Sequence, residues 1–349
     1  MTESVHPEKK GPAAGMPSAV ETEPPLLMDL ERNVYLEGDR LVLVDRRRLP
    51  GEIVRVACET AEDVARAIED MVVQGAGDIA VTAGYGLYLA SLRPGTGDRE
   101  GLERAARRLK ATRPTGYHLA ALMDRILERI DGNPEDPPSV ILRSLERALR
   151  RQREISVETG RFGETLLASG DTILTHCFAG SGLLHMLRFA REKGKDVRVF
   201  CTETRPYLQG ARLTAWSVSS LGLETVLITD NMAAHFLSRG EIGKVFTAAD
   251  RIARDGSVAN KVGTLAIAIA AHRYGVPFYV LGYGGPDRRT EKGADIPIEE
   301  RDPGEVLRFQ GIPITGPRVK ARYPAFDITP PELVTAVVTA SGILHREGR

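Results

Sequence analysis

The stretch at residues 245–264, VFTAADRIARDGSVANKVGT, decides the fold of this chain. It begins as a short apolar run, passes Asp250 and Arg251, turns at an Asp-Gly pair and returns to a helical pattern at Asn260. In an α/β unit this order places Asp250 just after a strand and Asn260 and Lys261 near a helix start, where open parallel sheets bind ligands. We therefore expect an acid and an anion-binding lysine at one crevice. An ordinary loop ion pair between Asp250 and Arg251 is the alternative.

The second half of the chain repeats this kind of unit. Short apolar runs occupy residues 172–176, 197–201, 225–229, 244–248 and 277–281, and helical segments separate them. Such alternation is typical of a parallel sheet wound by right-handed crossovers. We predict an α/β protein whose C-terminal domain, residues 156–349, is Rossmann-like, with an apolar helix at about 333–344.

The first half has a different pattern. Residues 1–25 are rich in Pro, Gly, Glu and Lys and predict a disordered tail. Residues 41–45 and 53–57 predict a short β-hairpin. Beyond the hairpin the pattern is mostly helical, with helices expected at about 60–72 and 80–90 and another opened by residues 112–116. We predict a smaller, mainly helical N-terminal domain at residues 26–155.

Composition excludes several classes of protein. The 47 basic residues balance 47 acidic ones, so we expect neither a nucleic acid nor a membrane as partner. No apolar run is long enough to span a membrane, and the N-terminus lacks the apolar core of a secretory signal, which predicts a cytoplasmic protein. Three cysteines without paired spacing argue against a disulfide framework and against a metal site.

Polar groups follow four of the predicted strands. Cys177 follows the first, a polar loop at 202–210 the second, Asp230 the third and Asp250 the fourth. A merely structural sheet does not require this convergence at one edge, so it favours an enzyme. The alternatives are a cysteine that is a small buried hydrophobe, an Asp230 that caps a helix, and a His176 that bonds locally.

The helical half contributes two further candidates. A glycine-rich break at Gln74-Gly75-Ala76 precedes a helix, which lets the backbone approach an anion closely. Arg113 opens another helix and can point at the same anion. A plain loop between packed helices and an ordinary surface arginine are the alternatives.

Nine segments in order then resemble the methylthioribose-1-phosphate isomerase family over about residues 40–345. They are VQGA (73–76), RPT (113–115), THC (175–177), ETRPYLQGARLTA (203–215), TDNMA (229–233), ADRI (249–252), NKVGT (260–264), IPIEER (296–301) and PAFDITPP (324–331). The resemblance implies an aldose-ketose isomerase of methionine salvage that converts a 5-substituted ribose 1-phosphate to the ribulose 1-phosphate. It implies a homodimer joined through the Rossmann-like halves, with no metal and no organic cofactor.

The resemblance also implies roles for individual residues. Cys177 matches a transition-state stabiliser or acid/base, and Asp250 matches the proton donor. The positions that match substrate contacts are Gln74, Gly75, Ala76, Arg113, Gln209, Asn260 and Lys261.

Two departures keep other functions open. In the glycine-rich loop, the family usually has arginine where this chain has Gln74, and Pro-Ala where it has Gly77 and Asp78. In addition, residues 281–287, LGYGGPD, replace a family segment rich in Ser, Thr and Asp. A paralogue that isomerises 5-deoxyribose 1-phosphate, another ribose phosphate or unphosphorylated methylthioribose is therefore an alternative. A second alternative, from a different class, is a non-catalytic regulatory subunit of the translation-initiation guanine-nucleotide exchange factor, which shares the fold. The presence of both Cys177 and Asp250 favours the enzyme, since a scaffold needs neither.

Overall fold

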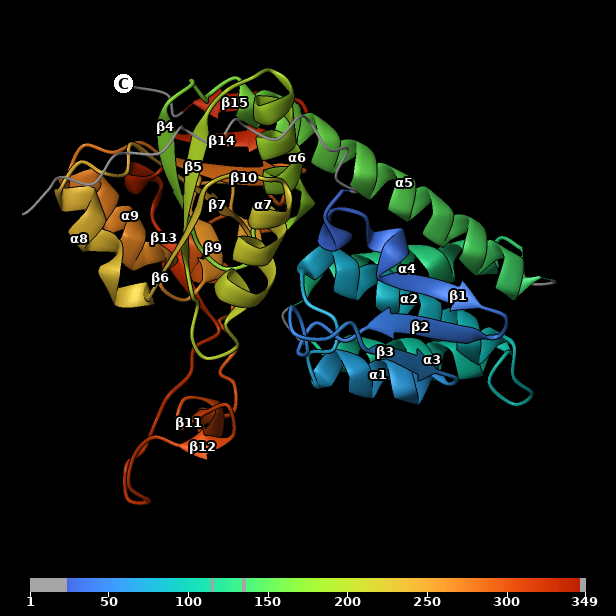
Figure 1. The fold of residues 1–349 in the computed structure, drawn as a ribbon. Helices are drawn as coiled ribbons and strands as arrows, with labels where there is room; N and C mark the ends of the chain where they lie inside the picture. The colour runs from blue at the N-terminus through green and yellow to red at the C-terminus, as the bar shows by residue number, and fades with distance from the viewer. Residues whose placement is uncertain (1–23, 114–115, 134–135, 346–349) are drawn as a thin grey trace, which may run out of the picture.

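The computed structural model describes residues 24–113, 116–133 and 136–345. Within them the chain forms two lobes that a single long helix, α5 (Pro137–Glu164), connects (Figure 1). One hydrophobic cluster fills the N-terminal lobe, and two clusters lie on opposite faces of a large sheet in the C-terminal lobe. The expected tail falls almost entirely outside the described residues.

A three-stranded antiparallel sheet opens the N-terminal lobe. Its strands, in spatial order, are β1 (Val34–Glu37), β2 (Arg40–Val44) and β3 (Arg55–Cys58). Strands β2 and β3 confirm the predicted hairpin, whereas β1 was not predicted. Leu41 and Leu43 alternate along β2 and point into the cluster of this lobe, as the two-residue period of a strand requires.

Four helices complete this lobe: α1 (Ala61–Glu69), α2 (Ala76–Ser91), α3 (Arg99–Ala111) and α4 (Tyr117–Asp131). Thr60 starts α1 as predicted, because its hydroxyl accepts the Asp63 N–H (3.1 Å) while the Asp63 carboxylate accepts the Thr60 N–H (2.9 Å). Helix α2 begins at Ala76, four residues before the expected start. The expected start of the fourth helix at Pro114 and Thr115 lies outside the described residues.

The long helix α5 belongs to both lobes. Val140, Ile141 and Leu145 near its beginning pack in the N-terminal cluster. Near its end, Gly160 allows close packing against α6 (Gly180–Glu192), since a Cβ there would lie 2.6 Å from the His185 Cβ. The boundary placed between residues 155 and 156 therefore falls inside one continuous helix.

The C-terminal lobe is built on a seven-stranded sheet, which confirms the predicted fold class. The strands are hydrogen-bonded in the order β15-β14-β10-β7-β4-β5-β6, and every neighbouring pair is parallel except β14 with β15. Their bounds are β4 (Asp171–Thr175), β5 (Val197–Thr202), β6 (Thr225–Ile228), β7 (Lys244–Ala248), β10 (Phe278–Tyr283), β14 (Ala336–Thr339) and β15 (Gly342–His345). The five predicted runs thus correspond to five strands of this sheet.

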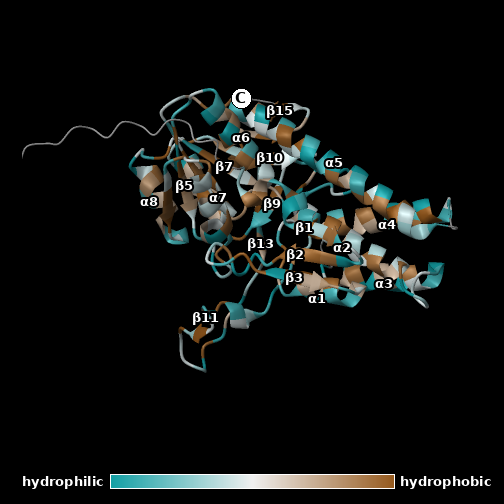
Figure 2. Cartoon of the chain, turned by 45° about the vertical axis from the view of Figure 1, so that its right-hand side comes forward, coloured by the Kyte–Doolittle hydropathy of each residue, from teal (hydrophilic) through white to brown (hydrophobic). Residues whose placement is uncertain are grey.

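Helices cover both faces of the sheet (Figure 1). Helix α6 and α7 (Trp216–Ser220) pack on one face, and α8 (Ala233–Ser238) and α9 (Thr264–Arg273) pack on the other. Neighbouring residues of one strand enter opposite clusters, as Ile173 and Leu174 do on β4. Figure 2 shows the resulting contrast, since β5 is mainly apolar whereas the solvent-facing α3 and α5 carry many polar residues.

Single-turn and π-helical segments connect the larger elements. They are η1 (Leu26–Met28), η2 (Leu30–Arg32), η3 (Gly210–Ala215, π-helical), η4 (Asp230–Met232), η5 (Gly293–Asp295), η6 (Pro303–Glu305) and η7 (Pro331–Leu333).

Two sequence-based expectations about the second half were wrong. The C-terminal helix at 333–344 is instead the hairpin β14–β15, in which the β-branched Val337 and Val338 favour an extended backbone. The helical pattern expected at Asn260 and Lys261 is instead the end of β9 (Val258–Lys261). This strand lies between β8 (Arg251–Ile252) and β13 (Phe326–Thr329) in a separate antiparallel sheet.

A long arm leaves the body between Glu300 and Pro324, which pair at its base. It carries the two-residue strands β11 (Arg308–Phe309) and β12 (Ile312–Pro313) and projects away from both lobes (Figure 1). Ile312, Ile314 and Val319 on this arm are large apolar side chains that are at least half exposed.

Candidate active site

The two residues expected to perform chemistry lie at the ends of neighbouring strands. Cys177 follows β4 by two residues, Asp250 follows β7 by two residues, and β4 pairs directly with β7. Because both strands are parallel, their carboxyl ends meet at one edge of the sheet. Cys177 and Asp250 therefore lie at the same edge of the sheet.

Backbone contacts hold Cys177 in an unusual conformation. Its φ angle is 61°, in the left-handed region that non-glycine residues rarely adopt. The Cys177 N–H donates to the Thr204 hydroxyl (3.0 Å), and the Cys177 carbonyl accepts from the Thr214 hydroxyl (2.6 Å). Burial raises the pKa of the Cys177 thiol, and the nearby Lys261 and the Phe178 N–H oppose this effect. The sulfur is thus held beside a backbone donor and a cation, two groups that favour a thiolate.

His176, next to the cysteine, is a structural residue. Its Nδ1 lies 2.6 Å from the Thr202 hydroxyl of β5, and its Nε2 lies 3.0 Å from the Val262 carbonyl. Gly263 must be small here, since a Cβ on it would lie 3.2 Å from the imidazole and its φ is 106°. The local bonding expected of His176 is confirmed, and it connects β4 to the segment after β9.

Asp250 lies in a site that disfavours its charge. Its N–H donates to the Ala259 carbonyl (2.9 Å), which ties it to β9. Burial raises the pKa of the Asp250 carboxyl, whereas His118, Lys261 and Arg251 each act to lower it. Because a neutral carboxyl is a proton donor, this environment suits a general acid.

Lys261 interacts electrostatically with both Cys177 and Asp250. It is 8% exposed, and its ammonium lies 4.8 Å from the ring centroid of Phe326 and 5.9 Å from that of Tyr323. Burial lowers the pKa of Lys261, while Cys177 and Asp250 raise it. The lysine, thiol and carboxyl are therefore close enough to set one another's charge.

An anion-binding site was expected at the start of α9. The backbone N–H groups there are instead bound by a side chain of the protein. The Asp327 carboxylate accepts the N–H groups of Gly263 (2.7 Å) and Leu265 (3.2 Å). The Asn260 amide donates one of its two N–H groups to the Thr264 hydroxyl (3.0 Å). Burial raises the pKa of Asp327 to about 6.

The N-terminal lobe reaches the site through Arg113. Its guanidinium bonds the Glu299 carboxylate (3.3 Å), which also binds Arg301 (3.1 Å). Arg301 also donates to the Tyr207 hydroxyl (2.8 Å) and forms an ion pair with Glu305 (3.3 Å). This network joins the segment just after α3 to the base of the arm, and the side chains of Arg113 and Arg301 are only 11% exposed.

The glycine-rich loop is arranged differently from the expectation. Gly75 caps α2 with a φ of 100°, which favours glycine, and Gln74 is buried with its amide nitrogen donating to the Met71 carbonyl (3.1 Å). The Gln74 side-chain oxygen has no hydrogen-bond partner among the described residues. Asp78 binds the buried Arg46 (2.6 Å) and accepts from the Gln152 amide (2.8 Å).

Arg46 was missed by sequence analysis and supplies a cation at this loop. Its guanidinium also donates to the Gln74 carbonyl and lies 5.6 Å from the ring centroid of Phe178, the residue after Cys177. The loop is therefore connected to the strand-end site through Arg46. Nothing in an isolated RRR cluster indicates that its first arginine is 1% exposed.

The loop after β5 places Gln209. Asp230 accepts the N–H groups of Thr204 and Arg205, each at 2.7 Å, so it fixes this loop instead of capping its own helix. The loop leads into the π-helical segment η3, which begins at Gly210. Gln209 is buried, and its side-chain oxygen has no partner among the described residues.

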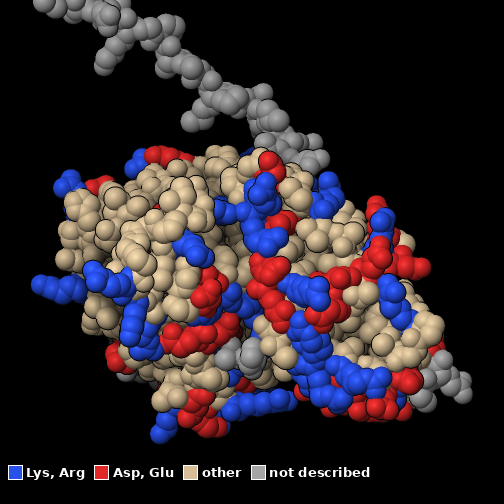
Figure 3. All heavy atoms as spheres, turned by 90° about the horizontal axis from the view of Figure 1, so that it is seen from below, with Lys and Arg blue, Asp and Glu red and all other residues tan. Residues whose placement is uncertain are grey.

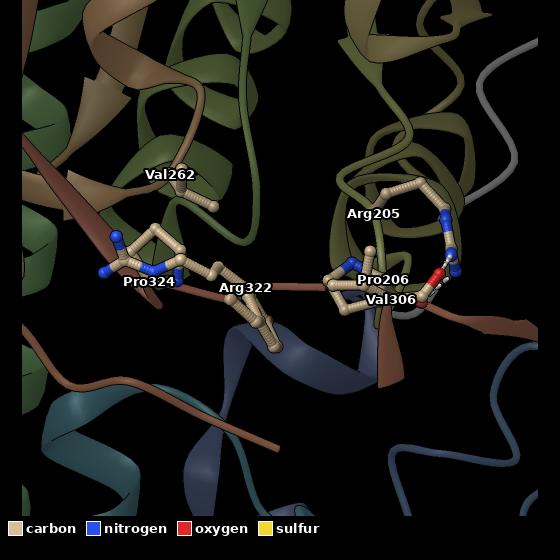
Figure 4. A pocket seen from close by; sticks show the side chains of 7 residues that line it. Arg205, Pro206, Val262, Val306, Arg322 and Pro324 are labelled. Atoms are coloured by element: carbon tan, nitrogen blue, oxygen red, sulfur yellow. Dashed lines mark hydrogen bonds between the residues drawn. The ribbon is translucent and has the colours of Figure 1, made fainter. Parts of the chain in front are cut away.

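Two surface hollows flank these residues. The first has a volume of about 190 Å³ and is lined by Arg205, Pro206, Val262, Val306, Arg322, Tyr323 and Pro324 (Figure 4). The second is lined by Arg205, Pro206, Tyr207, Asp302, Gly304, Glu305, Arg308, Gln310 and Gly311. Neither hollow is lined by Cys177 or Asp250. Two residues of the first hollow adjoin Lys261, because Val262 follows it in the chain and the Tyr323 ring lies 5.9 Å from its ammonium. The first hollow therefore borders the site. No group of three His, Cys, Asp or Glu residues suited to a metal ion occurs in the described ranges.

Comparison with known proteins agrees with this architecture. The sequence pattern of the initiation factor 2 subunit family matches residues 62–346 of this chain. A methylthioribose-1-phosphate isomerase of Desulforudis audaxviator is 42% identical over 89% of this chain and 93% of its own length. One from Petrotoga mobilis is 43% identical over 88% of this chain and 93% of its own.

Solved structures include both an enzyme and an initiation factor. The 5-methylthioribose 1-phosphate isomerase of Pyrococcus horikoshii is 34% identical, with a TM-score of 0.81 and coverage of 93% of each chain. The structure described as translation initiation factor eIF-2B subunit delta of A. fulgidus is also 34% identical, with a TM-score of 0.76, covering 90% of this chain and 96% of that one. Identity to solved structures alone does not separate the two classes.

Proposed function

We propose that this chain, which belongs to the initiation factor 2 subunit family, is a methylthioribose-1-phosphate isomerase of methionine salvage. It converts S-methyl-5-thioribose 1-phosphate, or a close 5-substituted ribose 1-phosphate, to the corresponding ribulose 1-phosphate. The observation that supports this most is that Cys177 and Asp250 follow the paired strands β4 and β7 at one edge of the sheet, where Lys261 acts on the pKa of both. Curated relatives of that name, about two fifths identical over most of both chains, support the same substrate.

The reaction explains the protonation states that the site favours. A 1-phosphorylated ribose is locked as a ring, so the bond between C1 and the ring oxygen must break while that oxygen takes up a proton. We assign this proton to Asp250, since burial favours its neutral form. Hydrogen then moves from C2 to C1, and the 2-hydroxyl loses its proton to give the ketone. Cys177 lies beside Lys261 and the Phe178 N–H, where it can stabilise charge or exchange a proton at these carbons.

We assign phosphate and sugar binding to the groups around this pair. Arg113, Lys261, Asn260 and the amides of Gly75 and Ala76 bind the phosphate. Charge-assisted hydrogen bonds of this kind are about twice as strong as neutral ones. Gln209 and Gln74 bind sugar hydroxyls, since each has a buried side-chain oxygen that lacks a partner among the described residues. No metal or organic cofactor is needed for these steps.

The paralogue alternative differs only in the sugar. Because Asp78 is occupied by Arg46 and Gln152, it is not free to bind a hydroxyl of an unphosphorylated sugar. We therefore favour a phosphorylated substrate. Measuring kcat/KM for S-methyl-5-thioribose 1-phosphate, 5-deoxyribose 1-phosphate and unphosphorylated methylthioribose, with wild type and Gln74→Arg, tests the choice. A wild-type preference for the unphosphorylated sugar overturns it.

The non-catalytic alternative is favoured by one observation, the likeness to the structure described as subunit delta. A regulatory subunit requires no thiol and carboxyl at the ends of neighbouring strands. Isomerase turnover without any effect on guanine-nucleotide exchange supports the enzyme. Nucleotide-exchange regulation without turnover on any sugar of the panel refutes it.

The remaining expectations concern the setting of the enzyme. No helix of the described residues is long and apolar enough to cross a membrane. Acidic and basic side chains are interspersed on the face in Figure 3, which supports the absence of a nucleic-acid partner. We also propose a cytoplasmic location. A C2 homodimer is a further proposal, and the exposed Ile312, Ile314 and Val319 of the arm support it. Sedimentation at micromolar concentration tests the dimer, and a monomer there contradicts it.

A further inference from the structure

Arg46 follows the end of β2 by two residues, at a place where the two lobes touch. The next residue, Arg47, accepts a hydrogen bond at its carbonyl from the guanidinium of Arg212 in the C-terminal lobe. The guanidinium carbon of Arg46 itself lies 5.6 Å from the ring centroid of Phe178, the residue after Cys177. Arg46 therefore lies where the N-terminal lobe meets the segment that carries the reactive thiol.

The planar guanidinium of Arg46 holds two parts of the glycine-rich loop at once. One of its nitrogens donates to the Gln74 carbonyl, and another donates to the Asp78 carboxylate (2.6 Å). Gly75 lies between these two residues in the chain. A Cβ on Gly75 would lie 3.6 Å from the Asp78 Oδ2 and 3.9 Å from the Arg46 Nη1. The arginine and the carboxylate therefore lie on the same side of Gly75.

The backbone N–H groups of the loop are left for another partner. Gln74 is buried, whereas the next residue, Gly75, is exposed. The peptide between them is trans, so its N–H points away from its carbonyl and hence away from Arg46. No side chain of the described residues caps α2, a helix of 16 residues. The N–H groups of Gly75 and Ala76 therefore stay available at the positive end of a long helix.

The ion pair also keeps an acid from competing for this helix start. Asp78 belongs to the first turn of α2, where the helix attracts anions. Its carboxylate is instead bound by Arg46 and by the Gln152 amide (2.8 Å). Stability alone explains the pair poorly, because desolvation offsets the attraction of buried charges and the Arg46 Nε has no partner in the described part of the chain. A role in ligand binding accounts for it better.

We propose that Arg46 is a positioning residue for the phosphate of the substrate. It holds the Gln74 carbonyl and the Asp78 carboxylate on one side of the glycine-rich loop. The N–H groups of Gly75 and Ala76 then face the phosphate on the other side. The proposal rests on the proposed isomerase function. Arg46 does not itself touch the phosphate, because its side chain is 1% exposed and Asp78 already balances its charge.

The test measures phosphate binding directly, with inorganic phosphate as the probe. In Arg46→Met, we expect the dissociation constant for phosphate, measured by calorimetry, to rise roughly tenfold, since a hydrogen bond to a charged group contributes about that factor or more. The KM for S-methyl-5-thioribose 1-phosphate rises by a similar factor with a smaller change in kcat, and inhibition by unphosphorylated methylthioribose stays the same. Arg48→Met is the matched control, because Arg48 is an exposed neighbour paired with Glu52, and it keeps the wild-type values.

Two further variants separate positioning from a merely structural role. Arg46→Lys keeps a charge opposite Asp78 but loses the planar fork, so we expect thermal unfolding close to that of wild type together with weaker phosphate binding. Ala76→Pro removes one N–H at the first position of α2, where proline is compatible with a helix. The effects of Ala76→Pro and Arg46→Met on phosphate binding should be less than additive, because both act through the same N–H groups.

Three results overturn the proposal. They are wild-type phosphate binding in Arg46→Met, an equal weakening of phosphate and unphosphorylated sugar, and fully additive effects of Arg46→Met and Ala76→Pro. If Arg46→Met does not fold, wild-type phosphate binding in Arg46→Lys overturns it instead. Phosphate binding requires no turnover, so the two proposals fail separately. A wild type that isomerises no sugar, but loses phosphate binding on Arg46→Met as expected, refutes the proposed function and leaves the role of Arg46 intact.

Discussion

The two lobes build their halves of the candidate site in different ways. In the C-terminal lobe, Cys177 and Asp250 follow paired parallel strands and are fixed by backbone hydrogen bonds. In the N-terminal lobe, Arg113 follows the end of α3 and the Gly75 loop precedes α2, and both are held by side-chain contacts such as Arg113 with Glu299. Backbone hydrogen bonds fix the reacting groups at the sheet edge, whereas a single substitution can remove a side-chain contact of the N-terminal lobe. We therefore expect chemistry to depend on the first half of the site and substrate choice on the second.

The largest effect is expected for Asp250→Asn. The amide keeps the shape of the side chain but has no acidic proton, so kcat falls by roughly a hundredfold or more. Because burial raises the pKa of Asp250, the wild-type acid keeps its proton to higher pH than an exposed aspartate does, and the rate declines as pH rises through that pKa. Steady-state kinetics from acid to neutral pH check this, and a variant with the wild-type rate removes Asp250 from the mechanism.

Cys177→Ala is expected to lower kcat by roughly a hundredfold, since it removes the thiol beside Lys261 and leaves the backbone unchanged. Cys201→Ala is the matched control. Cys201 is fully buried on β5 and packs in the core, so its truncation lowers the thermal midpoint and leaves kcat near the wild-type value. Equal kinetic effects of the two substitutions contradict the special role of Cys177.

Arg113→Met tests the N-terminal half of the site. A hydrogen bond to a charged group contributes about 1.5 to 3 kcal/mol, so loss of a phosphate contact raises KM by roughly tenfold to a hundredfold with a smaller change in kcat. Arg99→Met, an exposed arginine on α3, is the control and leaves KM unchanged. If the loss appears in kcat alone, Arg113 does not bind the substrate as assigned.

The smallest effect concerns stability at the start of α9. Burial raises the pKa of Asp327 to about 6, above its unfolded value near 3.9, so the folded state binds more protons between these two pH values. The wild-type free energy of unfolding should therefore fall by about 2 kcal/mol relative to Asp327→Asn as pH rises from 4 to 6. Chemical denaturation of both proteins at several pH values measures this difference, and parallel curves contradict it.

The residues at the sheet edge could be predicted from the sequence, whereas the side-chain contacts of the N-terminal lobe could not. The apolar runs before Cys177 and Asp250 have a length and spacing that only strands of a wound sheet explain, so the positions after them were predictable. The role of Arg46 depends on its ion pair with Asp78, which lies 32 residues away in the sequence. The strand at Asn260 was misread because a short apolar run before a helix does not distinguish the two structures. The C-terminal hairpin was missed for the same reason.

The central claim, that the crevice between the lobes isomerises a ribose 1-phosphate, is tested most directly by observing the product. Wild-type protein is incubated with S-methyl-5-thioribose 1-phosphate labelled with ¹³C at C2, and the spectrum is followed by nuclear magnetic resonance. We predict that the C2 signal moves from the range of a hydroxyl-bearing carbon to that of a ketone, and that Asp250→Asn slows this change by roughly a hundredfold or more. A wild-type spectrum in which C2 never becomes a ketone contradicts the claim.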